Sequence, residues 1–169
     1  MQKADSLQGK LSHLVFFLTA LLVVAADQLS KLWIRSNLAR GESLPEAGAF
    51  RLIYVQNSGA AFGLFQDQSF PLTIVALIGV AVLLVFVIFI YHRLPFLDSW
   101  LGKPALGLVL GGTIGNLVDR LRLGYITDFI GIGIWPTFNI ADSAIVVGVM
   151  LFAYCLRSLT GAKKTNLSA

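Results

Sequence analysis

The sequence predicts an all-α membrane protein with four transmembrane helices, and three observations lead to this fold class. Of the 169 residues, 56% are hydrophobic and only 13% are charged, whereas soluble domains carry about 25% charged residues. The apolar residues form long runs, and a helix needs roughly 20 of them to cross a bilayer. The basic residues gather at the two ends and in one loop, as membrane topology favours. We therefore treat residues 1–169 as a single integral membrane domain.

Four apolar segments have the length of membrane spans. Proline opens two of them, at Pro71 and Pro104, and the expected spans are residues 11–34, 71–91, 104–121 and 139–157. The first span follows two lysines, as the apolar part of a signal peptide does. Its apolar pattern continues past the small residues at 24–26, so we expect a retained helix and no cleaved leader.

The distribution of basic residues predicts the orientation of the spans. The two ends and the loop after the second span hold Lys3, Lys10, Arg93, Lys103, Arg157, Lys163 and Lys164. Because segments rich in lysine and arginine stay in the cytoplasm, both termini are expected there. Residues 35–69 then lie outside the cytoplasm, next to the far ends of the first and third spans.

Residues 35–69 are too polar to cross a membrane, and they contain two short apolar runs. Residues 50–55 are rich in β-branched and aromatic side chains, and residues 60–65 form the second run. Asn57, Ser58 and Gly59 between them are a turn signal. We expect a small sheet or hairpin resting on the membrane surface, in which Asn57 serves either the turn or a functional site.

Acidic and amide side chains lie at the ends of the apolar spans and in the linker between the last two. They are Asp27, Asn116, Asp119, Arg120, Asp128, Asn139 and Asp142. With alternating spans, all of them meet at the outer leaflet. Ionisable groups are costly at such places, so their presence predicts a working site.

Helical spacing predicts two contacts of the first and third spans. Asp27 and Lys31 are four residues apart and can pair on one helical face; the alternative is a Lys31 that reaches the interface beside an incidental acid. Gly107, Gly111 and Gly115 recur every four residues, the pattern that lets membrane helices pack closely.

Two further pairs have a structural interpretation and a functional one. Asp119 and Arg120 are adjacent, and we predict an ion pair that keeps Asp119 charged in a structural role. Asn139 and Asp142 follow Pro136 and are three residues apart. They fit either a helix cap with an acid in the first turn or two members of a site.

Two carboxylates at a poorly hydrated interface share a proton, so one can activate water while the other acts as the acid. This arrangement can hydrolyse a peptide bond without a metal or a covalent intermediate. Asp142 is one candidate, and the residues alone leave Asp119 and Asp128 open as its partner. A nucleophilic serine is disfavoured because the chain has no GxSxG motif and neighbouring helical positions, such as Ser30 and Lys31, do not face each other.

Other functions find little support in the sequence. Two histidines, one cysteine and no HExxH motif leave few zinc ligands, so neither a metal nor another cofactor is expected. The net charge of +4 follows from the membrane topology, so nucleic acid is not an expected partner. A carrier or proton-conducting subunit would hold its acids at the bilayer midplane, and a scaffold would need no converging carboxylates.

Five motifs occur in a characteristic order along the chain. They are DQLSK from Asp27, NSGAAF from Asn57, GGTIGNLVDR from Gly111, ITDF around Asp128 and FNIADS ending at Ser143. Together they resemble bacterial lipoprotein signal peptidase (signal peptidase II), a family of aspartic endopeptidases of the inner membrane, over all four spans. The resemblance implies that Asp128 and Asp142 are the catalytic dyad.

The resemblance also implies a substrate and a pocket. The substrate is a prolipoprotein whose lipobox cysteine carries a diacylglyceryl group, cut on the amino side of that cysteine in the membrane lipid. We expect a monomer, although the sequence does not reveal the oligomeric state. Residues 35–69 correspond to the family's β-cradle and periplasmic helix, while residues 129–138 are shorter than the matching loop of several members. The pocket binds the antibiotic globomycin in this family and is lined or braced by Asp27, Asn57, Asn116, Asp119, Arg120 and Asn139.

Overall fold

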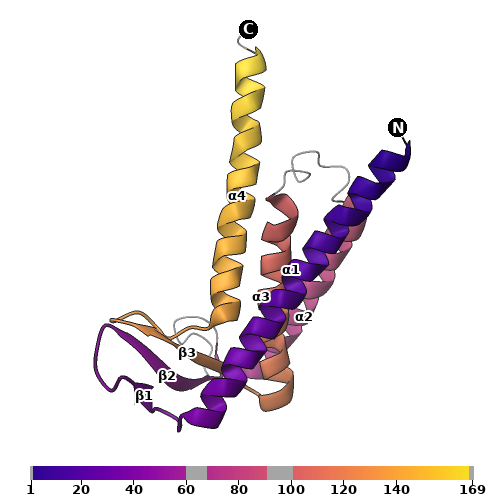
Figure 1. The fold of residues 1–169 in the computed structure, drawn as a ribbon. Coiled ribbons are helices and arrows are strands. Elements are labelled where there is room, and N and C mark those ends of the chain that lie inside the picture. The colour runs from indigo at the N-terminus through magenta and orange to yellow at the C-terminus, as the bar shows by residue number, and fades with distance from the viewer. Residues whose placement is uncertain (1, 60–67, 91–100, 168–169) are drawn as a thin grey trace.

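The computed structural model describes residues 2–59, 68–90 and 101–167, in which long helices carry a small sheet at one end (Figure 1). The helices are α1 (Gln2–Asn37), α2 (Ser69–Val85), which continues into the π-helical turn η2 (Phe86–Ile90), α3 (Gly102–Leu123) and α4 (Ile140–Leu167). The strands are β1 (Ser43–Leu44), β2 (Phe50–Asn57) and β3 (Ile126–Ile132).

Three helices in the described ranges are long and apolar enough to cross a membrane, namely His13–Asn37, Ser69–Phe89 and Ile140–Arg157. These correspond to the first, second and fourth predicted spans. The third, α3, has sufficient length with 22 residues, but glycines and polar groups make it less apolar. More than half of α3 is buried by its neighbours, so its surface does not need to be apolar. Four spans therefore remain a prediction, of which three are supported by length and composition.

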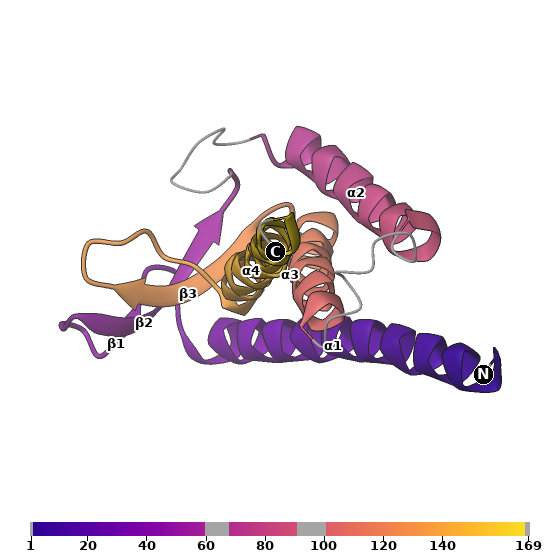
Figure 2. The same ribbon diagram turned by 90° about the horizontal axis from the view of Figure 1, so that it is seen from above.

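Helix α3 lies at the centre of the bundle, between α1 and α2 and beside α4 (Figure 2). Its glycines allow this position. A Cβ atom on Gly107 or Gly111 would lie 2.7 Å or 2.6 Å from a backbone oxygen of α1, closer than real Cβ contacts come. One on Gly112 would collide with the backbone of Ala141 in α4. The close helix packing predicted from the glycine spacing is confirmed.

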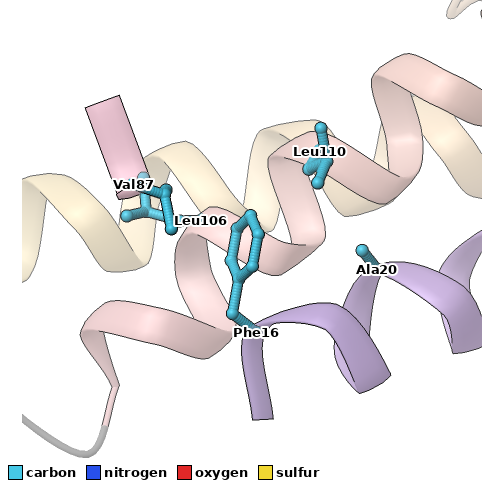
Figure 3. Packing of buried hydrophobic residues seen from close by; sticks show 5 residues of the cluster. All are labelled: Phe16, Ala20, Val87, Leu106 and Leu110. Carbon is cyan, nitrogen blue, oxygen red and sulfur yellow. The ribbon is translucent and has the colours of Figure 1, made fainter. Parts of the chain in front are cut away.

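An apolar cluster ties α1 and η2 to α3 at the end of the bundle away from the sheet (Figure 3). Phe16 and Val87 are fully buried there. The remaining members are Ala20, Leu106 and Leu110. Because lipid tails are as apolar as these side chains, the cluster stabilises the bundle mainly through van der Waals contacts between closely packed helices.

The sheet has the strand order β1-β2-β3, and its long pair joins distant parts of the chain. Strand β2 runs antiparallel to β3, with Val55 opposite Asp128 and Asn57 opposite Ile126. The expected hairpin between residues 50–55 and 60–65 cannot be compared directly, because residues 60–67 lie outside the described ranges. Asp128, expected in a loop, lies instead on a strand, because the β-branched and aromatic residues around it favour extended backbone.

A second apolar cluster fastens the sheet to the end of α1. It consists of Ile34, Leu38, Tyr54 and Phe129, all of them buried. Phe129 directly follows Asp128. The packing of Phe129 against the end of α1 therefore fixes the position of the Asp128 carboxyl group along the helices. The sheet itself projects sideways from the place where α1 ends and α4 begins (Figures 1 and 2).

Candidate active site

Hydrogen bonds and ion pairs connect the acids and amides predicted as site residues. These residues come from α1, β2, α3, β3 and α4, and Asn139 lies just before α4. The buried members are Asp27, Asn116, Asp119, Asp128 and Asn139. All five lie near the sheet end of the helices. None of them belongs to the apolar cluster at the other end.

Asp142 occupies the first turn of α4 and exchanges two hydrogen bonds with Asn139. The Asn139 backbone N–H donates to Asp142 Oδ2 (3.2 Å), and the Asp142 backbone N–H donates to Asn139 Oδ1 (2.9 Å). This is a reciprocal helix cap. Asp142 Oδ1 also accepts a bond from Asn116 Nδ2 (2.8 Å). The capping interpretation is therefore correct, and it does not exclude a role in the site.

Asp128 receives two amide donors from different elements. Asn139 Nδ2 lies 2.7 Å from Oδ1 and Asn57 Nδ2 lies 2.9 Å from Oδ2. The Asn57 side chain also accepts the backbone N–H of Gly59 at 3.0 Å, so it serves both the turn and the site. Burial, and next the charge of Asp142, raise the pKa of Asp128 to about 7.

Asn139 links the two candidate catalytic acids. Its side chain donates to Asp128 and its backbone N–H donates to Asp142. A fully buried residue thus holds both carboxyl groups from one place. Because like charges disfavour double ionisation, the charge of Asp142 contributes to the raised pKa of Asp128.

Lys31 lies at the centre of the network, although sequence reasoning did not include it among the site residues. It is fully buried, and its Nζ lies 2.8 Å from Asp27 Oδ2 and 3.3 Å from Asp119 Oδ2. The predicted pair with Asp27 is confirmed, and the alternative of an interfacial lysine is wrong. The four-residue spacing to Asp27 was the signal that could have identified it.

Lys31 also fixes the orientation of Asn116. Its Nζ donates to Asn116 Oδ1 at 2.9 Å, and Asn139 Nδ2 donates to the same oxygen at 3.1 Å. An ammonium group has no acceptor, so Asn116 must turn its oxygen toward Lys31. Its Nδ2 is consequently directed at Asp142.

The predicted ion pair between Asp119 and Arg120 is wrong. Adjacent helical residues point about 100° apart, and Arg120 turns away to donate from Nη2 to the carbonyl of Gly59 at 2.9 Å. Asp119 instead pairs with Lys31 and with Arg35, whose Nη1 lies 3.5 Å from Oδ1. Asp119 keeps its structural role with different partners.

Asp119 and Arg35 together hold the start of β3. The backbone N–H of Thr127 donates to Asp119 Oδ2 at 2.9 Å, and Arg35 Nη1 donates to Thr127 Oγ1 at 2.9 Å. Asp128 is the next residue on the strand. Nothing in the sequence spacing connects Arg35 with Thr127, so this contact could not be expected in advance.

Asp27 joins α1 to the beginning of α4. Its Oδ1 accepts the backbone N–H of Ala141 at 3.0 Å, one of the donors that a helix leaves unpaired at its N-terminus. A Cβ atom on Gly115 would lie 2.6 Å from Asp27 Oδ2. Only glycine therefore allows the carboxylate to reach α4, and Asp27 braces the helix that carries Asp142.

Arg120 is the one predicted site residue whose hydrogen-bonding groups are incompletely used within the described residues. Its buried Nε has no hydrogen-bond partner there. The guanidinium group interacts electrostatically with the carboxylates of Asp142 and Asp128. A buried donor of this kind is a candidate contact for a ligand. Within the same part of the chain, no group of three or more His, Cys, Asp or Glu side chains is placed to hold a metal ion.

The fold and the site define a helical membrane protein with a buried acid and amide site at one end of its helices. The family model described as signal peptidase (SPase) II matches residues 19–157. The chain belongs to this family. It is accordingly a peptidase that removes signal peptides from prolipoproteins.

Relatives and solved structures agree with this assignment. The lipoprotein signal peptidase of Dehalococcoides mccartyi is 50% identical over 147 residues, which are 86% of this chain and 91% of that protein. The one from Moorella thermoacetica is 48% identical over 142 residues, 83% of this chain and 91% of that protein. A bacterial membrane enzyme of known structure superposes with a TM-score of 0.78 at 30% identity, covering 88% of this chain and 90% of that one.

Proposed function

We propose that Asp128 and Asp142 are the catalytic dyad of this signal peptidase. The observation that carries the proposal is the position of Asn139, which holds one carboxyl group through its side chain and the other through its backbone. Asp119, the other candidate partner of Asp142, is engaged by Lys31, Arg35 and the backbone of β3. It has little freedom to exchange a proton with substrate.

The surroundings suggest which acid holds the proton. Asp142 lies in the first turn of α4, where the positive end of the helix dipole favours a carboxylate. Asp128, with a pKa near 7, retains the proton. Asp142 then removes a proton from a water molecule, and the oxygen of this water attacks the scissile carbonyl carbon. At the same time, Asp128 protonates the carbonyl oxygen. When the tetrahedral intermediate collapses, the amine takes a proton from Asp142 and Asp128 recovers its own.

Other residues of the network bind substrate or brace the dyad. The Nε of Arg120, which has no partner within the described residues, is suited to a carbonyl oxygen of the substrate backbone. The same side chain binds the carbonyl of Gly59, two residues after Asn57. Asp27, Lys31, Asn116 and Asp119 contact other protein groups and keep the acids in place; we assign them to bracing.

The substrate is proposed to be a prolipoprotein whose lipobox cysteine carries a diacylglyceryl group, cut on the amino side of that cysteine. The motif resemblance supports this, and so does the position of Asp142 at the start of a lipid-facing helix. The test is incubation of the purified protein with a lipid-modified lipobox peptide, with and without globomycin. The matched control is the same peptide with an unmodified cysteine. Equal cleavage of both peptides, or no inhibition, would contradict the proposal.

We further propose four spans in a bacterial inner membrane, with cytoplasmic termini and the site at the outer leaflet. The distribution of basic residues supports this orientation. In a Cys155→Ser background, a cysteine replacing Ser43 should react with a membrane-impermeant thiol reagent in intact cells, and one replacing Ser99 should not. The opposite pattern would place the dyad on the cytoplasmic side and would refute this topology.

A further inference from the structure

Four large apolar side chains are exposed together at the far end of the sheet. We call them the apolar tip: Phe50, Ile132, Ile134 and Trp135. Phe50 lies opposite Ile132 in the register of β2 and β3. Their exposed fractions are 58%, 48%, 106% and 61%, so Ile134 projects completely from the protein.

The backbone of the apolar tip is held in a defined turn. Gly133 adopts a φ of 53°, and its N–H donates to the carbonyl of Ala49 at 2.6 Å. The N–H of Trp135 donates to the carbonyl of Ile132 at 2.9 Å. These hydrogen bonds orient Ile134 and Trp135 outward. Their exposure is therefore a property of the fold.

The tip lies at the height where the lipid-facing surface of α4 begins. Figure 2 looks along α4 and shows the sheet projecting sideways from it, and Figure 1 shows the turn after β3 level with the first turn of that helix. Exposed apolar residues follow along α4, among them Val146, Val147 and Met150. The apolar tip and this surface therefore occupy adjoining depths.

We infer that the apolar tip inserts into the interfacial region of the membrane leaflet on the active-site side. Tryptophan prefers that region because one end of its ring system is apolar and the other can donate a hydrogen bond. A lipid surface also fits the size of the patch. The four side chains expose less than the roughly 800 Å² that each partner buries in a standard protein interface, whereas membrane insertion requires no minimum partner area.

The consequence concerns the position of Asp128, which lies on the same strand as Ile132. Anchoring the tip in lipid sets the depth of β3 relative to the bilayer, and so the depth at which a peptide bond can be cut. This inference rests on the proposed placement of the helices across the membrane.

The test uses the full chain with Trp33 and Trp100 replaced by Phe, so that Trp135 is the single tryptophan and is excited selectively over the four tyrosines. The protein is placed in nanodiscs whose lipids carry bromine either near the headgroup or near the bilayer centre. We expect a loss of Trp135 emission that is larger with the headgroup-proximal bromine, and little quenching by iodide in water. Ile134→Ser should weaken the bromine quenching. Because Ile134 is fully exposed, this substitution should leave the fold unchanged.

Three results would overturn the inference. The first is iodide quenching without bromine quenching. The second is protection from iodide that appears only when a lipobox peptide is added, which would make the peptide the occupant. The third is protection that requires two protein copies in one disc. Because fluorescence needs no turnover, failure here is distinct from failure of the proposed dyad.

Discussion

Replacing the buried Lys31 by methionine removes the cation of the site while nearly preserving side-chain length. In the wild type, its Nζ contacts Asp27 at 2.8 Å, Asp119 at 3.3 Å and Asn116 at 2.9 Å. Lys31 and both acids are at most 1% exposed, so solvent cannot compensate the charges left behind. Breaking a buried ion pair in this manner costs on the order of 3–5 kcal/mol.

Two consequences of Lys31→Met can be measured separately. Thermal unfolding in detergent should occur at a clearly lower temperature than in the wild type. Asp27→Asn combined with Lys31→Met should be less destabilised than the sum of the single variants, because one uncompensated charge has been removed. At temperatures where Lys31→Met is folded, kcat should still fall, since Asn116 is no longer forced to direct its Nδ2 at Asp142.

Arg122→Met is the matched control. Arg122 lies in the last turn of α3 and is exposed, so its replacement should change stability by less than about 0.5 kcal/mol. If Lys31→Met were as stable and as active as Arg122→Met, the account of a central buried cation would be refuted.

Three further predictions follow from contacts of the site and of the helices. Asp119→Asn should lower both the unfolding temperature and the activity, because Thr127 and the two cations lose a carboxylate; a fully stable but inactive variant would move Asp119 into the catalytic group. Gly111→Ala should destabilise by about 1–3 kcal/mol through overpacking, whereas Gly79→Ala, with open space around it, should be neutral or stabilising. Since Asp128 loses its proton above a pKa of about 7, kcat/KM should fall as the pH rises through 7; a constant kcat/KM from pH 6 to pH 9 would contradict the protonated-acid role.

Composition and spacing were sufficient for the helical parts of the fold. Long apolar runs identify helices wherever lipid is the solvent. The four-residue glycine spacing around Gly111 correctly predicted a close helix contact, which the structure shows with α1. The pair of Asp27 and Lys31 followed from helical periodicity. These features are local, so they can be recognised within one stretch of sequence.

A small sheet was expected from residues 50–55, but the pairing of β2 with β3 and the partners of Asp119 could not be predicted, because they depend on contacts between distant segments. Strand β3 contains an acid and a glycine that interrupt the apolar pattern, and its partner β2 lies some 70 residues earlier, as the separation of 71 between Asn57 and Asp128 shows. Arg35 reaches Thr127 across 92 positions. Adjacency in sequence suggested Arg120 as the partner of Asp119, but helical geometry separates neighbours.

The pairing of Asp142 with Asp128 also exceeded what residue spacing alone could decide, and the resemblance to signal peptidase II was needed to choose between Asp119 and Asp128. The structure adds a physical reason for the same choice. Asp119 is surrounded by cations and a backbone donor. Within the described residues, the carboxyl group of Asp128 instead accepts hydrogen bonds from the neutral amides of Asn57 and Asn139. Nearby cations would keep an acid ionised, so an acid that must hold and then donate a proton needs neutral surroundings like those of Asp128.

The dyad is tested most directly by cleavage of a lipid-modified lipobox peptide by Asp128→Asn and by Asp142→Asn. Glu46→Gln, an exposed acid outside the network, serves as the matched control, and unfolding curves establish that each variant is folded. We predict no detectable turnover by either dyad variant and normal turnover by the control. Near-normal turnover by a folded Asp128→Asn or Asp142→Asn enzyme would contradict the assignment.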